Sequence, residues 1–346
     1  MQTRLLYLFT RTPLHVGAGS SVGAIDQPIV RERHTGFPII PASSLKGTFA
    51  DEWLTDDMPR NGKGERVRVL AKDGDKGTTF ETCDAAWLFG SDDANNAWAG
   101  ALQFSEARLL AFPIRSARGS FAWITCPLML ARGARDGVFE EKTRKLIEGL
   151  EEPADDKALF GMGKLELDVT RNGQVLKQIV LEDYTFTRTG NDEAGELGRA
   201  LWKLLAADPV WQEVATRLVI LSNGMMSFFA QHACEIAQHV KISDETGTAA
   251  GGALFNQENV PSEAFFYSVL HAFEERTANK RTDQRRKADA ALTAFETKAN
   301  GKVFQFGGDA STGLGYCTVK VAAGVPPARN GSKPAGETPA STAAAP

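Results

Sequence analysis

The sequence contains few cysteines, no long hydrophobic run and no excess of positive charge. Its 346 residues include 4 cysteines, which are widely spaced and form no CxxC pair. A reducing compartment is therefore expected, without a cysteine-rich zinc site. No stretch approaches the roughly 18 consecutive apolar residues that a transmembrane helix needs, and the N-terminal segment, interrupted by Arg4 and Arg11, lacks a small-residue cleavage site. We expect a cytoplasmic protein with no membrane segment.

The net charge of −4 gives no general attraction for nucleic acid, because phosphate binding usually needs a basic surface. The charges are unevenly distributed, however. Basic residues gather around 31–46, 60–76 and 280–287, whereas acidic residues gather around 140–156 and 192–196. A locally basic groove on an acidic body is possible, so the overall charge does not decide whether the protein binds nucleic acid.

The pattern of elements predicts an α+β fold with an antiparallel sheet. Ser43 or Ser44 would cap a first helix, and Asn172–Gly173 would form the turn of a hairpin over 164–184. The tail from about residue 323 is rich in Pro, Ala, Ser and Thr and is expected to be disordered. Strands are expected at 3–10, 101–110, 119–126, 217–221, 264–271, 302–306 and 315–321, and helices at 44–54, 193–206, 225–238 and 277–298.

The glycine-rich segment from His15 to Asp26 fits neither of the common nucleotide-binding loops. Its spacing is GxGxxxG, and it continues into Pro28 and an extended segment instead of a helix, which excludes a Rossmann fingerprint. The sequence has no GxxxxGK[ST] string, which excludes a Walker A loop. What is left is a loop whose backbone amides could approach a phosphate, with His15 before it and Asp26 after it. The alternative is a surface loop with an incidental aspartate.

Two further segments contain the residue types of a phosphate site. Ser43, Ser44 and Lys46 lie within one turn of the predicted helix start, where free amides favour an anion. The segment Gly307–Gly315 contains four glycines in nine residues between two predicted strands, which indicates close backbone contact, often with a nucleic acid backbone. A plain helix cap with a solvated lysine and a structural bulge are the respective alternatives.

Several strings of the sequence match one known family. The longest, HVGAGSSVGAIDQPIVRERHTGFPIIPASSLKGTF, begins at His15, and the glycine-rich loop closes the series. The strings between them are LFG, AGALQFSEARLL, FPIRS, FAWITCP, ETGT, GALF and FYSV. Together they resemble the RAMP superfamily, and specifically the repeated backbone subunit of type III-B (Cmr) CRISPR–Cas effectors. The resemblance covers almost the whole chain except the tail.

The resemblance implies one domain over residues 1–322, with an RRM-like (ferredoxin-like) palm and a long β-hairpin thumb at about 240–262. Helical insertions into the palm would lie at about 55–100 and 127–215. Copies would stack head to tail into a filament along a CRISPR guide RNA, together with other type III-B subunits. The thumb would push between the bases of guide and complementary target RNA at regular intervals. The subunit would then cut the target as an endoribonuclease that depends on Mg²⁺ or another divalent metal.

The resemblance also assigns roles to individual residues. Asp26 matches the family's cleavage aspartate and would orient the attacking 2′-hydroxyl or hold the metal, with His15 and Glu258 as further catalytic residues. Glu258 is the one acid in the stretch Asn256–Asn259, where family members commonly carry a Tyr/Glu-rich sequence. Contacts to the RNA backbone are expected from Gly17, Gly19, Ser20, Ser43, Ser44, Lys46, Arg115, Gly307, Gly308, Ser311, Thr312, Gly313 and Gly315.

Two other functions stay open at this point. The chain could be a guide-RNA scaffold that does not cleave, in which Asp26 is present but inactive. It could also belong to a neighbouring RAMP type that processes guide RNA by metal-independent acid–base chemistry, with His15 or His34 acting.

Overall fold

The computed structural model describes residues 1–19, 23–56, 58–74, 77–93, 95, 97–161, 163–243, 245–277 and 284–325. The tail for which disorder is predicted lies outside these residues from position 326 onwards. None of the helices in the described ranges is long and apolar enough to cross a membrane.

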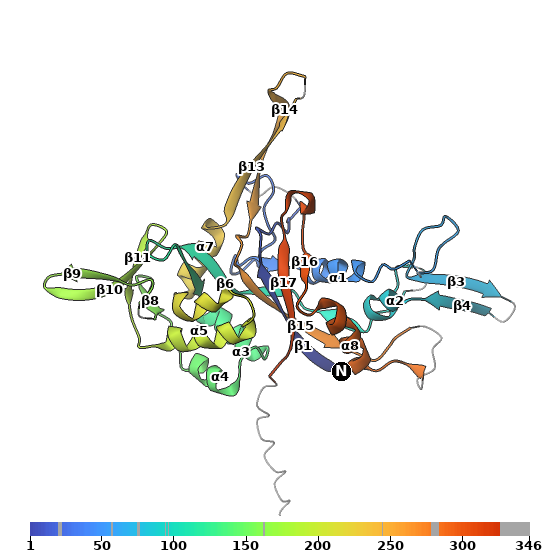
Figure 1. The fold of residues 1–346 in the computed structure, drawn as a ribbon, viewed down its shortest axis with the longest axis horizontal. Helices are drawn as coiled ribbons and strands as arrows, with labels where there is room; N and C mark the ends of the chain where they lie inside the picture. Colours follow the sequence, from blue (N-terminus) through green and yellow to red (C-terminus); the bar gives the residue numbers. More distant parts are fainter. Residues whose placement is uncertain are drawn as a thin grey trace, which may run out of the picture.

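A large mixed sheet forms the centre of the molecule (Figure 1). Its strands are β1 (Gln2–Thr10), β2 (Ile39–Ile40), β5 (Leu102–Phe104), β6 (Ala107–Arg115), β7 (Phe121–Thr125), β8 (Lys157–Phe160), β9 (Leu167–Arg171), β10 (Gln174–Leu181), β11 (Tyr184–Arg188), β12 (Leu218–Ile220), β15 (Phe265–Ala272), β16 (Val303–Gln305) and β17 (Tyr316–Ala323). The order along the 13-stranded sheet is β16-β17-β1-β15-β6-β7-β12-β8-β11-β10-β9, while β2 pairs with β6 and β5 with β15. The predicted antiparallel pairing holds except between β7 and β12 and between β8 and β11, which are parallel.

Helices cover both faces of the sheet, because its central strands are apolar at successive positions. In β1, Leu6 and Leu8 belong to one hydrophobic cluster, whereas Leu5, Tyr7 and Phe9 belong to another. Since successive side chains of a strand point to opposite faces, the two clusters lie on either side of the sheet. The first cluster includes α1 (Ala42–Asp51), α2 (Asp84–Phe89), α7 (Asn223–His232) and α8 (Ala288–Ala299), the second includes α4 (Glu141–Glu148), α5 (Glu193–Leu204), η1 (Trp211–Glu213) and α6 (Val214–Arg217), and α3 (Pro127–Arg135) contributes to both.

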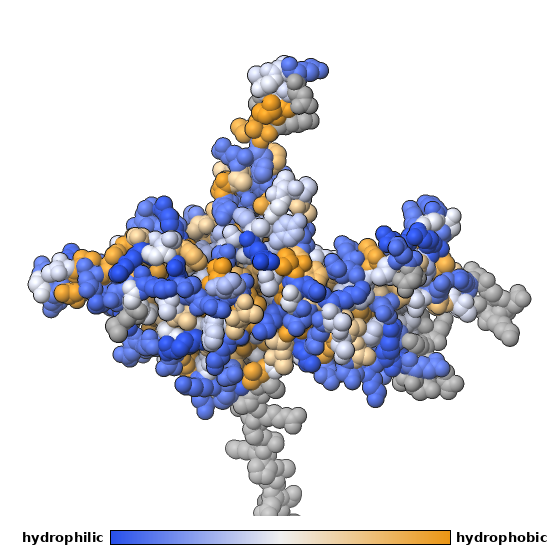
Figure 2. Space-filling view, viewed as in Figure 1, coloured by the Kyte–Doolittle hydropathy of each residue, from blue (hydrophilic) through white to orange (hydrophobic). Residues whose placement is uncertain are grey.

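Two hairpins are separate from the large sheet (Figure 1). The first pairs β3 (Val69–Gly74) with β4 (Gly77–Thr82), and the second pairs β13 (Glu235–Ile242) with β14 (Ala249–Asn259). The β13–β14 hairpin projects far from the body, and Figure 2 shows hydrophobic surface along it. Ile236, Val240 and Leu254 on this hairpin are 51%, 49% and 69% exposed. Exposed apolar residues on a projecting hairpin indicate a surface that meets another molecule.

The hairpin over 164–184 is confirmed as β9 and β10. Asn172 and Gly173 have φ angles of 53° and 78°, as a tight two-residue hairpin turn requires. A hairpin is also present where the excursion at about 240–262 is predicted, although β13 begins earlier, at Glu235.

Three details of the predicted helices are wrong. The helix expected over 225–238 ends at His232, because the following residues pair with β14. In place of the helix expected over 277–298, α8 begins at Ala288, and residues 278–283 of that prediction lie outside the described residues. Neither Ser43 nor Ser44 caps the first helix: α1 begins at Ala42 after Pro41 and has no side-chain cap, so both serines lie inside its first turn.

Candidate functional site

Segments that are far apart in the sequence meet at the base of the β13–β14 hairpin, which we define as residues 256–259. Asn256 and Glu258 contact the loop that contains Asp26. Gln257 points the other way, and its Nε2 donates to Oδ2 of Asp309 in the glycine-rich loop at 2.7 Å. Because neighbouring strand residues point to opposite faces, the hairpin base is held between the two glycine-containing loops.

Asp26 is exposed, and only one of its carboxylate oxygens is held. Oδ2 accepts a hydrogen bond from the main-chain N of Asn256 at 2.9 Å. Oδ1 has no hydrogen-bond partner within the described residues. A carboxylate accepts at both oxygens, so Oδ1 is available to a hydroxyl group or to a cation.

His15 is buried under the two glycine-containing loops. Its Nδ1 lies 2.7 Å from the main-chain O of Glu258. Since a carbonyl oxygen only accepts, Nδ1 carries the hydrogen and Nε2 is the free ring nitrogen. A Cβ atom at Gly17 would lie 3.0 Å from this Nε2, and the N–H of Gly308 donates to the main-chain O of His15 at 2.9 Å. The glycines therefore let two backbone segments pass close to the imidazole.

Glu258 is 3% exposed, and both of its carboxylate oxygens are hydrogen-bonded inside the chain. Oε1 accepts from Nη2 of Arg31 at 2.5 Å, and Oε2 accepts from the main-chain N of Ile29 at 3.1 Å. Arg31 also donates to the main-chain oxygens of Gly36 and Ala230, at 2.7 and 2.6 Å. The contacts of Glu258 thus fix the loop after Asp26, and they leave the carboxylate no free oxygen for substrate.

The glycine-rich loop is braced from inside by Gln305. Its Nε2 lies 3.1–3.2 Å from the main-chain oxygens of Phe306, Gly307, Gly308 and Leu314. With these carbonyls turned inward, the exposed positions of the loop include the predicted RNA-binding residues Gly307, Gly308, Ser311 and Thr312, as well as Asp309 and Ala310. Gly313 is half-buried. Gly315 is buried, and a Cβ there would lie 2.0 Å from the main-chain O of Phe306. Glycine is therefore required at this position by the packing of the loop.

The other predicted RNA-binding residues lie in three places. Gly17 and Gly19 are exposed in the loop before Asp26, while Ser20 lies outside the described residues. Lys46 is exposed on α1 and makes no ion pair with any described residue. It lines a cavity of about 420 Å³ together with Ser43.

Helix α1 contacts the end of β16, just before the glycine-rich loop, through Thr48, whose Oγ1 donates to the main-chain O of Gln305 at 3.4 Å. Ser44, one residue before the buried Leu45, is half-buried. Arg115 is not part of this assembly: it lies at the end of β6 and pairs with Glu182 at 2.9 Å.

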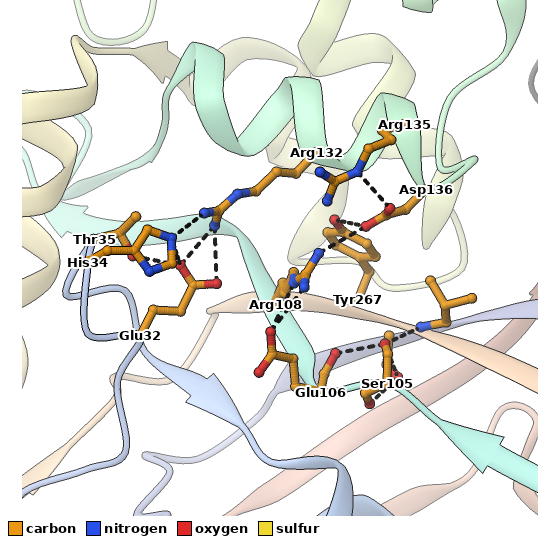
Figure 3. Close-up of polar contacts among 12 residues, drawn as sticks. Glu32, His34, Thr35, Ser105, Glu106, Arg108, Arg132, Arg135, Asp136 and Tyr267 are labelled. Atoms are coloured by element: carbon orange, nitrogen blue, oxygen red, sulfur yellow. Dashed lines mark hydrogen bonds and ion pairs between the residues drawn. The ribbon is translucent and has the colours of Figure 1, made fainter.

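His34 lies in a separate polar network beside α3 (Figure 3). Because a guanidinium only donates, Nε2 of His34 accepts from Nη2 of Arg132 at 2.9 Å. Burial alone would raise the pKa of Glu32, but hydrogen bonds from Thr35 and Arg132 and the charge of Arg132 hold that pKa below its usual value. No contact among the described residues joins His34 to His15, so the two histidines do not form an acid–base pair.

The hairpin base does not contain a complete metal site. The described residues have no group of three or more His, Cys, Asp or Glu side chains that could hold an ion. Asp26 offers one free oxygen, and Glu258 offers none. Mg²⁺ commonly keeps several waters and binds through one or two carboxylates plus substrate phosphates. These residues would fit only an ion that arrives with RNA, which Asp26 would hold through Oδ1.

Sequence reasoning missed the organising role of Asn256, Gln257 and Arg31. The available signal was the polar run at the end of β14, after Leu254 and Phe255, because polar residues at successive strand positions need partners on both faces. Which loops supply those partners depends on the tertiary fold and is not encoded locally.

Gly307→Ala is expected to destabilise the subunit more than Gly313→Ala. Both glycines have positive φ, 79° and 89°, but a Cβ at Gly307 would lie 2.0 Å from the main-chain O of His15, whereas one at Gly313 would meet nothing within 4 Å. Gly313→Ala should cost about 1–2 kcal/mol of backbone strain. Gly307→Ala should cost about 1–3 kcal/mol more, because backbone must move. Denaturant unfolding of the isolated subunit measures the difference, and equal losses would contradict the close approach.

Comparison with known proteins places these residues in context. A family model described as the RAMP superfamily matches residues 8–318. The "CRISPR system Cmr endoribonuclease Cmr4" of Pyrococcus furiosus is 28% identical over 327 residues, which are 92% of this chain and 95% of that protein.

Solved structures share the fold. The crystal structure of oligomeric Cmr4 from Pyrococcus furiosus has a TM-score of 0.60 and 23% identity, covering 93% of this chain and 98% of that one. A cryo-EM structure of the type III-B Cmr-beta complex bound to cognate target RNA contains a chain with a TM-score of 0.61 and 19% identity, covering 93% of this chain and 97% of that one.

Proposed function

Because this chain belongs to the RAMP superfamily, we propose that it is the repeated guide-RNA-binding subunit of a type III-B CRISPR effector and cleaves complementary target RNA. The observation that carries the proposal is the meeting of Asp26, His15 and the glycine-rich loop at the base of one projecting hairpin. The endoribonuclease named Cmr4, at 28% identity over most of both chains, supports the same assignment.

The guide would be held by its backbone. Phosphates can approach exposed glycines closely, and Gly17, Gly19, Gly307 and Gly308 are exposed on the loops beside the hairpin base. Lys46 adds a cation that no described residue neutralises. Such contacts do not depend on the base sequence, and a protein that binds guides of different sequence requires this independence. Further copies of the chain and other type III-B subunits would complete the assembly.

The hairpin β13–β14 would act as the thumb. Its exposed apolar residues Ile236, Val240 and Leu254 are suited to insertion between bases as apolar wedges and poorly suited to water. Inserted into the guide–target duplex, they would unstack one target nucleotide. A nucleotide freed from A-form geometry can turn its 2′-oxygen into line with the adjacent phosphorus.

Asp26 would assist the attack of that hydroxyl. The 2′-oxygen bonds to phosphorus as the bond to the 5′-oxygen breaks, which gives a 2′,3′-cyclic phosphate and a 5′-hydroxyl. Oδ1 of Asp26 accepts the 2′ proton, and the leaving oxygen takes a proton from water. Where Oδ1 holds a divalent ion instead, that ion would stabilise the negative charge on the phosphate oxygens, and water would take the 2′ proton. Glu258 and His15 would support the loops around the reacting group.

The proposal is tested with the complex reconstituted on a guide RNA and mixed with end-labelled complementary RNA, with and without Mg²⁺. Evenly spaced fragments that require the metal are expected. Assembly and target binding without any cleavage would identify a scaffold instead. Metal-independent cutting of precursor guide RNA would identify a processing ribonuclease.

A further inference from the structure

Asn256 holds the loop of Asp26 through both its main chain and its side chain. Its main-chain N donates to Oδ2 of Asp26 at 2.9 Å, and its main-chain O accepts from the N of Gln27 at 3.1 Å. Its side-chain Oδ1 accepts from the main-chain N of Asp26 at 2.8 Å, and its Nδ2 donates to the O of Ala24 at 3.0 Å. One residue of β14 therefore binds the aspartate and the segments on both sides of it.

The side chain of Asn256 must be an amide to make both of its contacts. Oδ1 faces an N–H group and Nδ2 faces a carbonyl, so an amide turned by half a rotation would bring like groups together. A carboxylate would lack the donor for Ala24, and an alanine would lack both groups. In the part of the chain that the structure describes, every hydrogen bond of Asp26 is made with Asn256.

Nothing else fixes the carboxylate of Asp26 as firmly. The residue is exposed, so packing does not restrict it, and the loop before it includes Gly23 with φ +65°. A catalytic group that is misplaced by about 1 Å can lose about 100-fold in rate. A catalytic role for Asp26 therefore requires a partner that orients it, and Asn256 is that partner in the geometry.

We propose that Asn256 is a positioning residue for RNA cleavage: its side chain holds the segment from Ala24 to Asp26, so that its main-chain N–H keeps Oδ2 of Asp26 and Oδ1 faces the target. This inference rests on the proposed function, because it has meaning only if Asp26 acts in cleavage. Asn256 lies two residues from the exposed Leu254 on the same strand. Asp26 is thus hydrogen-bonded to the hairpin that would separate the bases. The position of the cut in the target is therefore fixed by the position of that hairpin.

The test compares Asn256→Ala and Asn256→Gln with a matched control. Gln174 lies on the separate β9–β10 hairpin, is exposed, and makes no side-chain hydrogen bond to the described residues. Gln174→Ala therefore removes an exposed strand amide from a hairpin that takes no part in the site. Single-turnover cleavage by the reconstituted complex, measured over a range of target concentrations, separates the maximal rate from the half-saturating concentration.

Asn256→Ala is expected to lower the maximal rate about 10–100-fold, while the half-saturating target concentration stays as in the wild type. Asn256→Gln keeps the amide on a longer stem and should restore part of that rate. Gln174→Ala should behave like the wild type. Hydrogen exchange in the isolated subunit gives a readout without cleavage, because Asn256→Ala removes the acceptor of the Asp26 amide and should speed its exchange.

A wild-type maximal rate in Asn256→Ala would overturn the inference. A weaker target affinity of Asn256→Ala that accounts for its whole loss of cleavage would also overturn the inference, because it would indicate a structural role in the hairpin. If Asp26→Asn is inactive while both Asn256 variants cleave normally, this inference alone fails. If Asp26→Asn cleaves at the wild-type rate, the catalytic role of Asp26 fails with it.

Discussion

Replacing Asp26 by asparagine should remove target cleavage while leaving assembly and RNA binding intact. The substitution keeps the size of the side chain and an oxygen that can accept from the N of Asn256, so the loop keeps its conformation. It removes the negative charge and replaces Oδ1, the oxygen that no described residue holds and that we propose as the proton acceptor. Loss of a general base typically costs about 10²–10⁴ in rate, and a loss of at least about 100-fold is expected here.

The measurement is single-turnover cleavage of labelled RNA by the assembled complex. Asp56→Asn serves as the control, because its side chain is 98% exposed and the substitution makes the same change of charge. It should leave the rate unchanged. Cleavage by Asp26→Asn at the wild-type rate would assign the chemistry to a different group, and equal losses in both variants would point to overall charge instead of position.

Local chemistry was sufficient to predict some elements. The apolar run in β1 predicts a strand, and both hydrophobic clusters take residues from it. Asn172–Gly173 predicts a tight turn because only such residues readily accept positive φ at both positions. In these cases the residues themselves supply the energetic reason, and no distant partner is needed.

Other elements depend on partners that are distant in the sequence. Helical periodicity continues past His232, yet the chain turns into β13 because β14 is available to pair with it. The start of α1 also differs from the prediction. The fixed φ of Pro41, −57°, starts the helix before the serines that were expected to cap it. Local propensity is a weak guide where tertiary contacts can override it.

The candidate site illustrates the same limit. Asp26 and His15 were predicted from the sequence through the family resemblance, but their arrangement was not. Asp26 meets Asn256 over a separation of 230 residues, and His15 meets Glu258 over 243. Such contacts are set by how β14 leaves the hairpin and passes between two loops. The role of Arg31 is invisible in the sequence for the same reason.

The ion pair between Arg31 and Glu258 is expected to have the largest effect on stability. The two side chains are 18% and 4% exposed and lie 2.5 Å apart. Arg31 also donates to Sγ of Cys234 at 3.2 Å. Burial raises the pKa of Cys234 to about 11, so this group stays a neutral thiol and cannot replace the negative charge of Glu258.

Glu258→Ala should therefore destabilise the subunit by about 3–5 kcal/mol, as is typical when one partner of a buried pair is removed. The guanidinium of Arg31 would stay buried without an anion, and the N–H of Ile29 would lose its acceptor. Denaturant unfolding of the isolated subunit measures the loss. The double variant Arg31→Met/Glu258→Leu should be less destabilised than Glu258→Ala, because apolar pairs of similar volume often replace buried ion pairs at little cost.

Glu258→Gln distinguishes a structural role from a catalytic one. The amide keeps an acceptor for Arg31 but places an N–H opposite Ile29, so stability should fall by less than in Glu258→Ala. If Glu258 only holds the loop, cleavage by the folded complex should stay within about tenfold of the wild-type rate, as for a supporting residue outside the reaction. A loss of about 100-fold or more in a complex that still assembles and binds target would place Glu258 in the chemistry beside Asp26. It would also mean that RNA displaces one of the hydrogen bonds that now occupy both of its oxygens.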